Sequence, residues 1–156
     1  MTRTTMTRIE PVEIVARREA LGLTQAQLAA WLPWKQSRIS EVESGKRSWP
    51  DWATDRLAIA EKWLDTLADR LYTAGKNSPD RPVVIPTYTV ESHMWLINPE
   101  LRGLPVSVHR VAAVEAMKML ADDNIEARIG DFSVLSDMAA RYMTSSDTTQ
   151  IQEENS

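Results

Sequence analysis

The sequence has no cysteine, which excludes disulfide bonds, thiolate metal sites and cysteine nucleophiles. It has only two histidines, His93 and His109, too few to form a histidine metal site on their own. No apolar run approaches the ~20 residues that span a bilayer, and the first residues lack the apolar core of a secretory signal. We therefore expect a protein of a reducing compartment, the cytoplasm, with no membrane segment, metal or cofactor.

Catalytic motifs are also missing. There are only five glycines, and none belongs to a Gly-rich phosphate loop. His93 and His109 could act as general acids or bases beside Glu91 or Glu115, but no Ser/His/Asp pattern accompanies them. Lone histidines of this kind more often fill a core or a surface. We expect no catalytic residue, and the protein is not predicted to be an enzyme.

Charge is divided unevenly along the 156 residues. Residues 1–79 hold twelve Lys and Arg against ten Asp and Glu, whereas residues 80–156 hold six against twelve. The net charge of −4 therefore conceals a slightly basic first half and an acidic second half. Because attraction to DNA is screened beyond roughly 10 Å, a basic face in the first half is compatible with DNA binding.

The fold class is predicted to be mainly α, with a long fourth helix and a small α+β domain in the second half. Capping residues and apolar periodicity predict these elements: helices over residues 11–21, 25–32, 36–44, 50–74, 90–97, 105–121 and 133–143, and strands over residues 83–85 and 125–129. Thr24 and Thr89 are the expected N-caps of the second and fifth helices. In the fourth helix, apolar residues at alternating steps of four and three form a heptad seam. The distal half of this seam, from Leu64 to Ala74, is expected to pack on its own domain, on the second domain or on a partner subunit. Trp52, Ile59 and Trp63 form a second stripe expected to cover the N-terminal core.

The domain organisation follows from these elements and from composition. A flexible arm is expected over residues 1–10, and a first domain over 11–76. The Gly, Ser and Pro of residues 75–82 are typical of a linker, which we place over residues 77–82. A second domain over 83–143 is followed by a polar tail, residues 144–156, that is expected to be disordered.

The second and third helices crowd polar and basic groups into a short stretch of sequence. Spacing places Ile39 and Val42 on a buried face, and Ser37, Arg38 and Glu41 on the opposite, exposed face. The guanidinium fork of Arg38 matches O6 and N7 of guanine, so Arg38 is the residue most expected to determine specificity. Lys35 is interpreted as a phosphate contact. On an arbitrary helix such charges are simply solvated, and it is the surrounding motif that favours DNA contact.

That motif consists of spaced positions that agree without a gap: Arg18, Leu21-Gly22-Leu23-Thr24-Gln25, Leu28-Ala29, Leu32, Gln36 to Glu43, Gly45-Lys46 and Pro50. With these residues, 12–60 resembles the Cro/CI-type helix-turn-helix domain of phage and bacterial repressors, also called the XRE-like family. The resemblance implies that the third helix enters the major groove of DNA. It departs from the family pattern at Pro33, where glycine is usual, and at Lys35, where a Ser or Thr cap is usual. Since proline cannot take the left-handed backbone of that glycine, we expect the turn to differ locally.

The resemblance also implies roles for individual residues. Gln36, Ser37 and Glu41 would face base edges, although the negative charge of Glu41 would be repelled by phosphates. The remaining implied roles are a phosphate contact for Gln25, backbone contacts for Lys46 and Arg47, and a structural salt bridge between Arg18 and Glu43.

The second half carries no motif of comparable specificity. Its order of elements is loosely similar to the appended domains of YdiL-like proteins and of anti-CRISPR-associated autorepressors, in which the second domain makes a homodimer. The predicted function is therefore a dimeric, sequence-specific transcriptional regulator, most simply a repressor reading an inverted repeat in double-stranded DNA. The alternatives are an antitoxin-like module, whose second half sequesters a protein partner while DNA binding serves autoregulation, and an RNA-binding protein using the same basic face.

Overall fold

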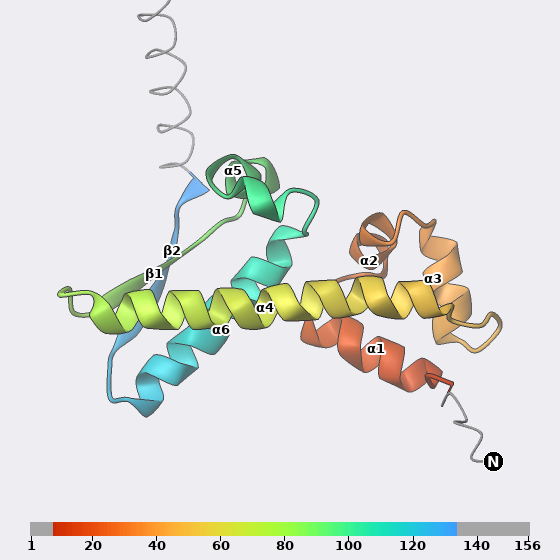
Figure 1. Cartoon of the computed structure of the whole chain (residues 1–156), viewed down its shortest axis with the longest axis horizontal. Coiled ribbons are helices and arrows are strands. Elements are labelled where there is room, and N and C mark those ends of the chain that lie inside the picture. The colour runs from red at the N-terminus through yellow and green to blue at the C-terminus, as the bar shows by residue number, and fades with distance from the viewer. Residues whose placement is uncertain (1–7, 134–156) are drawn as a thin grey trace, which may run out of the picture. The chain divides into compact units, whose positions relative to one another are not determined.

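The computed structural model describes residues 8–133, which fold as a mainly helical chain with one small sheet (Figure 1). Contacts divide the chain between Leu64 and Asp65 into two compact units. This division lies inside the fourth helix rather than at residues 77–82. The predicted helix over 133–143 and the predicted tail lie outside the described residues, as does most of the predicted arm.

The first unit packs three short helices against the start of a long one. The helices are α1 Pro11–Ala20, α2 Gln25–Trp31, α3 Gln36–Glu43 and α4 Asp51–Asn77. The apolar residues at helical spacing are almost completely buried and form the core: Ile14, Leu21, Leu23, Leu28, Leu32, Ile39, Val42, Ala53, Leu57 and Ala60. All four helices were predicted within a few residues, because their caps and apolar periods agree.

One predicted stripe of α4 does not cover this core. Trp52 and Ile59 are nearly half exposed, so the expectation that this stripe is buried on the N-terminal core is wrong for these two residues. The reason is that Ala53, Leu57 and Ala60, one step round the helix, already fill the buried face.

The second unit is built around a two-stranded parallel sheet. Strand β1, Val83–Thr87, pairs with β2, Ala127–Asp131, and Val83 is opposite Ala127. The connection between them consists of α5 Glu91–Ile97, the 3₁₀ turn η1 Pro99–Leu101, and α6 Val106–Asp122. Val83 and Ile85 pack on α6 through a buried cluster with Ala113, Ala116 and Leu120, and Leu71 and Tyr72 of distal α4 pack against that cluster. The distal half of the heptad seam therefore packs on the second unit.

The end of α4 approaches this cluster closely. A Cβ atom added to Gly75 would lie 2.8 Å from Leu120 Cδ1 and 3.2 Å from Val83 Cγ1. Glycine in the Gly75–Pro82 segment thus serves helix packing, whereas the sequence analysis assigned this composition to a linker. Strand β2 begins two residues later than predicted, because Ile125 packs against the cluster before the strand starts.

Thr89 does not cap α5, contrary to the prediction. The N-cap is Val90, which makes no side-chain cap hydrogen bond. Thr89 Oγ1 instead donates to Asp131 Oδ2 at 2.8 Å, and the Thr89 N–H donates to Ser133 Oγ at 3.0 Å. The Ser133 N–H and then the Thr89 hydroxyl, donating to the carboxylate, lower the pKa of Asp131 to about 2. Thr89 is therefore held at the strand ends by a hydrogen bond to a charged acceptor.

Within residues 8–133, no helix is long and apolar enough to cross a membrane. The same residues contain no group of three or more His, Asp or Glu side chains placed to hold a metal ion.

Candidate nucleic-acid interface

The start of α2 is fixed by a capping box. Thr24 Oγ1 accepts a hydrogen bond from the Gln27 N–H at 3.1 Å, and Gln27 Oε1 accepts one from the Thr24 N–H at 2.9 Å. These two bonds satisfy backbone donors that the first turn of a helix leaves open. Gln25 is therefore held in the first turn of α2, where the resemblance placed a phosphate contact.

The turn between α2 and α3 has the backbone of a Schellman motif with one hydrogen bond missing. The Trp34 N–H donates to the Ala29 carbonyl at 2.7 Å, and this is the bond that closes the wider loop of the motif. The motif's second bond would come from the N–H of residue 33, but Pro33 has no N–H. Pro33 nevertheless has a φ of 25°, so the expectation that proline keeps this turn out of the positive region is wrong. Leu32, which is fully buried, and the bonded Trp34 hold the strained residue from both sides.

We predict that Pro33→Gly raises the free energy of unfolding of the first unit by about 2 kcal/mol. Relief of backbone strain and a restored N–H bond contribute about 1–3 and 0.5–1.5 kcal/mol, and the greater entropy of the unfolded glycine chain offsets about 1 kcal/mol. Urea denaturation followed by tryptophan fluorescence measures the change, because five of the six tryptophans lie between residues 31 and 63. Pro33→Ala is the control, since it restores the N–H without favouring positive φ and should gain less. A lower urea midpoint for Pro33→Gly than for the native protein would contradict the prediction.

Helices α1, α2 and α3 are joined by a network around Glu43. Arg18 Nε donates to Glu43 Oε1 at 2.5 Å, and Arg18 Nη1 donates to the Leu23 carbonyl at 2.8 Å. Gln25 Nε2 donates to Glu43 Oε2 at 2.8 Å. Arg18 and Glu43 thus form the ion pair that the resemblance implied. One N–H of the Gln25 amide donates to Glu43 within the protein, so only the other amide N–H is left to donate to a phosphate.

One face of α3 is open beside this frame. Ile39 and Val42 are buried, whereas Gln36 and Ser37 are exposed. Lys35 is the N-cap of α3 and is also exposed, and it makes no side-chain cap bond. A hollow of about 360 Å³ opens on this face, and its lining consists of Pro33, Trp34, Lys35, Ser37, Arg38, Glu41 and Arg47. Five of the residues predicted to contact bases or phosphates therefore line one concave surface, together with the rings of Pro33 and Trp34.

Arg38 is only half exposed, although the helical spacing predicted a fully outward side chain. Its guanidinium carbon lies 4.2 Å from the centre of the Trp34 ring. Its Nε is buried and has no hydrogen-bond partner among the described residues. The stacked guanidinium can therefore present only its Nη groups to a ligand.

A comparison with protein families decides what kind of domain this geometry belongs to. The family model of the helix-turn-helix domain matches residues 12–61. This part of the chain is a helix-turn-helix domain. No curated protein matched the chain. The match runs from α1 into α4, and domains of this kind commonly bind DNA.

Glu41 of the helix-turn-helix domain is partly neutralised by a neighbour. Arg47 Nε donates to Glu41 Oε2 at 2.7 Å, and both side chains remain about half exposed. Gly45, with a φ of 79°, ends α3 and turns the chain so that Arg47 can reach back to it. The two residues were predicted to contact a base edge and a phosphate separately, but the structure pairs them, so they would meet DNA as a dipole rather than as isolated charges.

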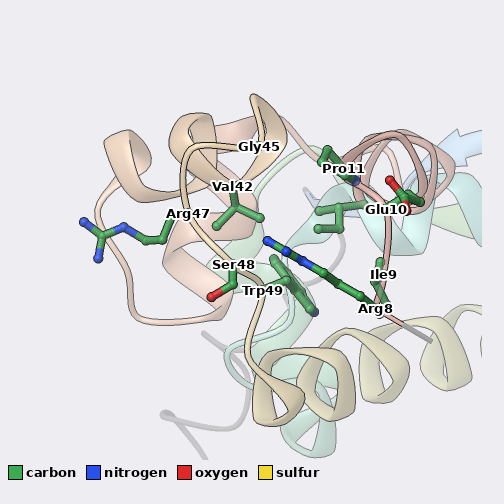
Figure 2. A pocket seen from close by; sticks show the side chains of 10 residues that line it. Arg8, Ile9, Glu10, Pro11, Val42, Gly45, Arg47, Ser48 and Trp49 are labelled. Carbon is green, nitrogen blue, oxygen red and sulfur yellow. The ribbon is translucent and has the colours of Figure 1, made fainter. Parts of the chain in front are cut away.

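A second hollow of the helix-turn-helix domain lies beside the first residues of α1 (Figure 2). Figure 2 shows the Arg8 side chain extended alongside Trp49, while Arg47 points away from this hollow. Lys46 is exposed at the end of α3 and lines neither hollow. The part of the predicted arm that the structure describes, residues 8–10, therefore lines the side of the domain.

Sequence reasoning missed two contacts of the interface, Arg38 with Trp34 and Glu41 with Arg47. Trp34 lies four residues before Arg38, a spacing at which side chains can meet. That spacing was the available signal. Nothing in the sequence signalled the second pair, because it depends on the turn after Gly45.

Proposed function

We propose that the protein is a dimeric, sequence-specific transcriptional regulator of the Cro/CI type, acting as a repressor in the cytoplasm without catalysis. The observation that carries this proposal is the exposed face of α3 in a helix-turn-helix domain, with Gln36, Ser37 and Arg38 beside the cationic Lys35. Gln and Arg have hydrogen-bonding edges that match adenine and guanine in the major groove. Lys35 would supply attraction to the phosphates.

The dimer in this proposal rests on a physical argument. One recognition helix contacts few base pairs, and a two-fold dimer places two of them on half-sites about 34 Å apart or a multiple of that. We assign the dimer contact to the second unit, which exposes about half of the apolar side chains of Val84, Leu96 and Ile97. This unit also carries the acidic half of the sequence, which is poorly suited to lie against phosphates.

Selection of bound sites from random DNA tests the proposal with the full chain. We expect an enriched inverted repeat whose half-sites are separated by whole turns of the duplex. An enriched single half-site would refute the dimer, and failure to enrich any sequence at low salt would refute the proposed function.

Arg38→Ala and Lys35→Ala are expected to affect binding differently. Loss of Arg38 should cost about 1–3 kcal/mol on the selected site and relax the preference at one base pair. Loss of Lys35 should weaken binding to all sequences about equally and reduce the slope of log K against log salt by about 1. Titrations of matched and single-substituted DNA duplexes at several salt concentrations measure both effects. If Arg38→Ala behaves like Lys35→Ala, the assignment of Arg38 to a base is wrong.

A further inference from the structure

Three tryptophans gather on the side of α3 from which Arg38 extends. The Trp34 ring lies edge-to-face against Trp49, with ring centres 5.5 Å apart and planes at 81°. It also lies edge-to-face against Trp52, at 5.2 Å and 83°. Such perpendicular arrangements are the favoured geometry of aromatic pairs. Trp34 is therefore held in one orientation by rings from two other segments of the same unit.

Trp49 and the backbone of Trp34 are each anchored by a hydrogen bond. Trp49 Nε1 donates to Thr54 Oγ1 at 2.8 Å, which ties the ring to the first turns of α4. The Trp34 N–H is bonded to the Ala29 carbonyl at the end of α2. The ring on which Arg38 stacks thus belongs to the rigid frame of the domain, although the ring itself is only half buried.

The stacking determines how Arg38 can approach a base. A guanidinium over an indole ring is attracted by the negative face of the ring, and indole is the strongest aromatic partner for this contact. The contact covers one face of the guanidinium, and the buried Nε cannot turn outward without breaking it. An arginine that is free to rotate can find acceptors on several bases or on a phosphate. One that is held on a ring keeps its Nη groups in one place and loses less conformational freedom on binding.

We propose that Trp34 is a positioning residue that determines specificity: it holds Arg38 so that Arg38 accepts only one base pair. This inference rests on the proposed function, because it concerns how the same face of α3 discriminates between sequences. Trp34 itself need not touch DNA. Its effect is exerted through Arg38, and its removal changes the ratio of affinities for matched and mismatched duplexes rather than the affinity for DNA in general.

The experiment uses the full chain and the site selected from random DNA. The base pair read by Arg38 is first defined as the one at which Arg38→Ala loses discrimination. The preference at that pair is then measured for the native protein, Trp34→Leu, Trp34→Phe, and the double variant Trp34→Leu/Arg38→Ala. We expect the native preference to be about tenfold or more. We expect Trp34→Leu to fall to the level of Arg38→Ala, Trp34→Phe to keep most of the preference, and the double variant to lose no more than Arg38→Ala alone.

A second stacked pair in the same domain provides a matched control. Arg56 lies 3.7 Å from the centre of the Trp31 ring, and neither residue lines the hollow on the face of α3. Arg56→Ala removes a comparable contact and should leave the base preference unchanged. Circular dichroism verifies that each variant is folded. Should Trp34→Leu not fold, Trp34→Tyr and Trp34→Phe are compared with the native protein instead. The base preference must then fall with the strength of the cation–π contact that each ring makes with Arg38, and indole makes the strongest.

Three results would overturn the inference. The first is that Trp34→Leu retains the native preference, and the second is that it weakens binding to all duplexes by the same factor, as a purely structural role would require. Losses of preference in the two single variants that add up in the double variant would also contradict it, because two residues acting through one contact must be coupled. Absence of any sequence preference in the native protein would instead refute the proposed function and is recognised before a variant is made.

Discussion

Replacing Glu43 with alanine should lower the free energy of unfolding of the first unit by about 3–5 kcal/mol. The Glu43 and Arg18 side chains are only 8% and 13% exposed, so the pair is largely shielded from water. Without Glu43, the guanidinium of Arg18 keeps the Leu23 carbonyl and a contact of 4.0 Å with Oε1 of Glu19, whose side chain is 67% exposed, and the Gln25 amide loses a partner as well. A shielded charge left with so weak a partner costs far more than the intact pair contributes. Urea denaturation followed by tryptophan fluorescence measures the loss.

A second ion pair of the same unit serves as the control for Glu43. Arg17 and Glu61 also join two helices, α1 and α4, but their side chains are 25% and 35% exposed. Water can replace the partner there, so Glu61→Ala should cost no more than about 1 kcal/mol. Glu43→Gln keeps the shape and two hydrogen-bonding atoms and should cost less than Glu43→Ala. Equal losses for Glu43→Ala and Glu61→Ala would show that burial does not determine the cost.

Acidification should destabilise the native protein by about 3 kcal/mol more than a variant that lacks His109. The His109 side chain is 4% exposed, its Nδ1 lies 2.9 Å from Thr87 Oγ1, and its ring meets Tyr88 edge-to-face at 5.2 Å. Burial disfavours the charged imidazolium and lowers the pKa of His109 from 6.5 to about 4. Between these two values the unfolded chain binds a proton that the folded chain does not. Stability is therefore complete above about pH 6.5, falls as the pH drops towards 4, and by linkage loses about 3 kcal/mol in total.

Urea denaturation followed by circular dichroism from pH 7 to pH 4 tests this dependence. His109→Gln retains an amide that can bond to Thr87 but cannot gain a proton, so its stability should fall less steeply than that of the native protein. His93→Gln is the matched control, because it removes the other histidine and leaves His109 in place. Carboxylates titrate in the same range in all three proteins, and comparison of the slopes cancels them. Identical slopes for the native protein and His109→Gln would contradict the prediction.

The parts of the fold that follow from local rules were predicted from the sequence. Thr24 with Gln27 determines where α2 begins, and the 3.6-residue period of Ile39 and Val42 determines which face of α3 is buried. These features depend on residues a few positions apart, so the sequence displays them directly. The parallel pairing of the strands was not predicted, because nothing local indicates that β1 and β2 are neighbours.

For the candidate site, the sequence indicates which residues share the outer face of α3, but it does not indicate their contacts. Gln36, Ser37, Arg38 and Glu41 were assigned to the outer face from spacing and resemblance. The partners of Arg38 and Glu41 could not be assigned in the same way, since they lie outside α3, in the turn before it and in the loop after it. Pro33 shows the limit most clearly. Its ring predicts a negative φ, and the packing of Leu32 and Trp34 on either side of it overrides that preference.

The pairing of β1 with β2 has a consequence for the order in which the chain acquires its structure. Val83 can meet Ala127 only after α5, η1 and α6 have been synthesised and folded back across the sheet. Helix α3 is held to α1 by contacts such as that of Arg18 with Glu43, which are 25 residues apart, and contacts of shorter range form faster. The N-terminal unit also leaves the ribosome first. The surface that we assign to DNA thus matures before the sheet of the second unit is complete, so the nascent chain acquires its reading face before the face that we assign to pairing with a second copy.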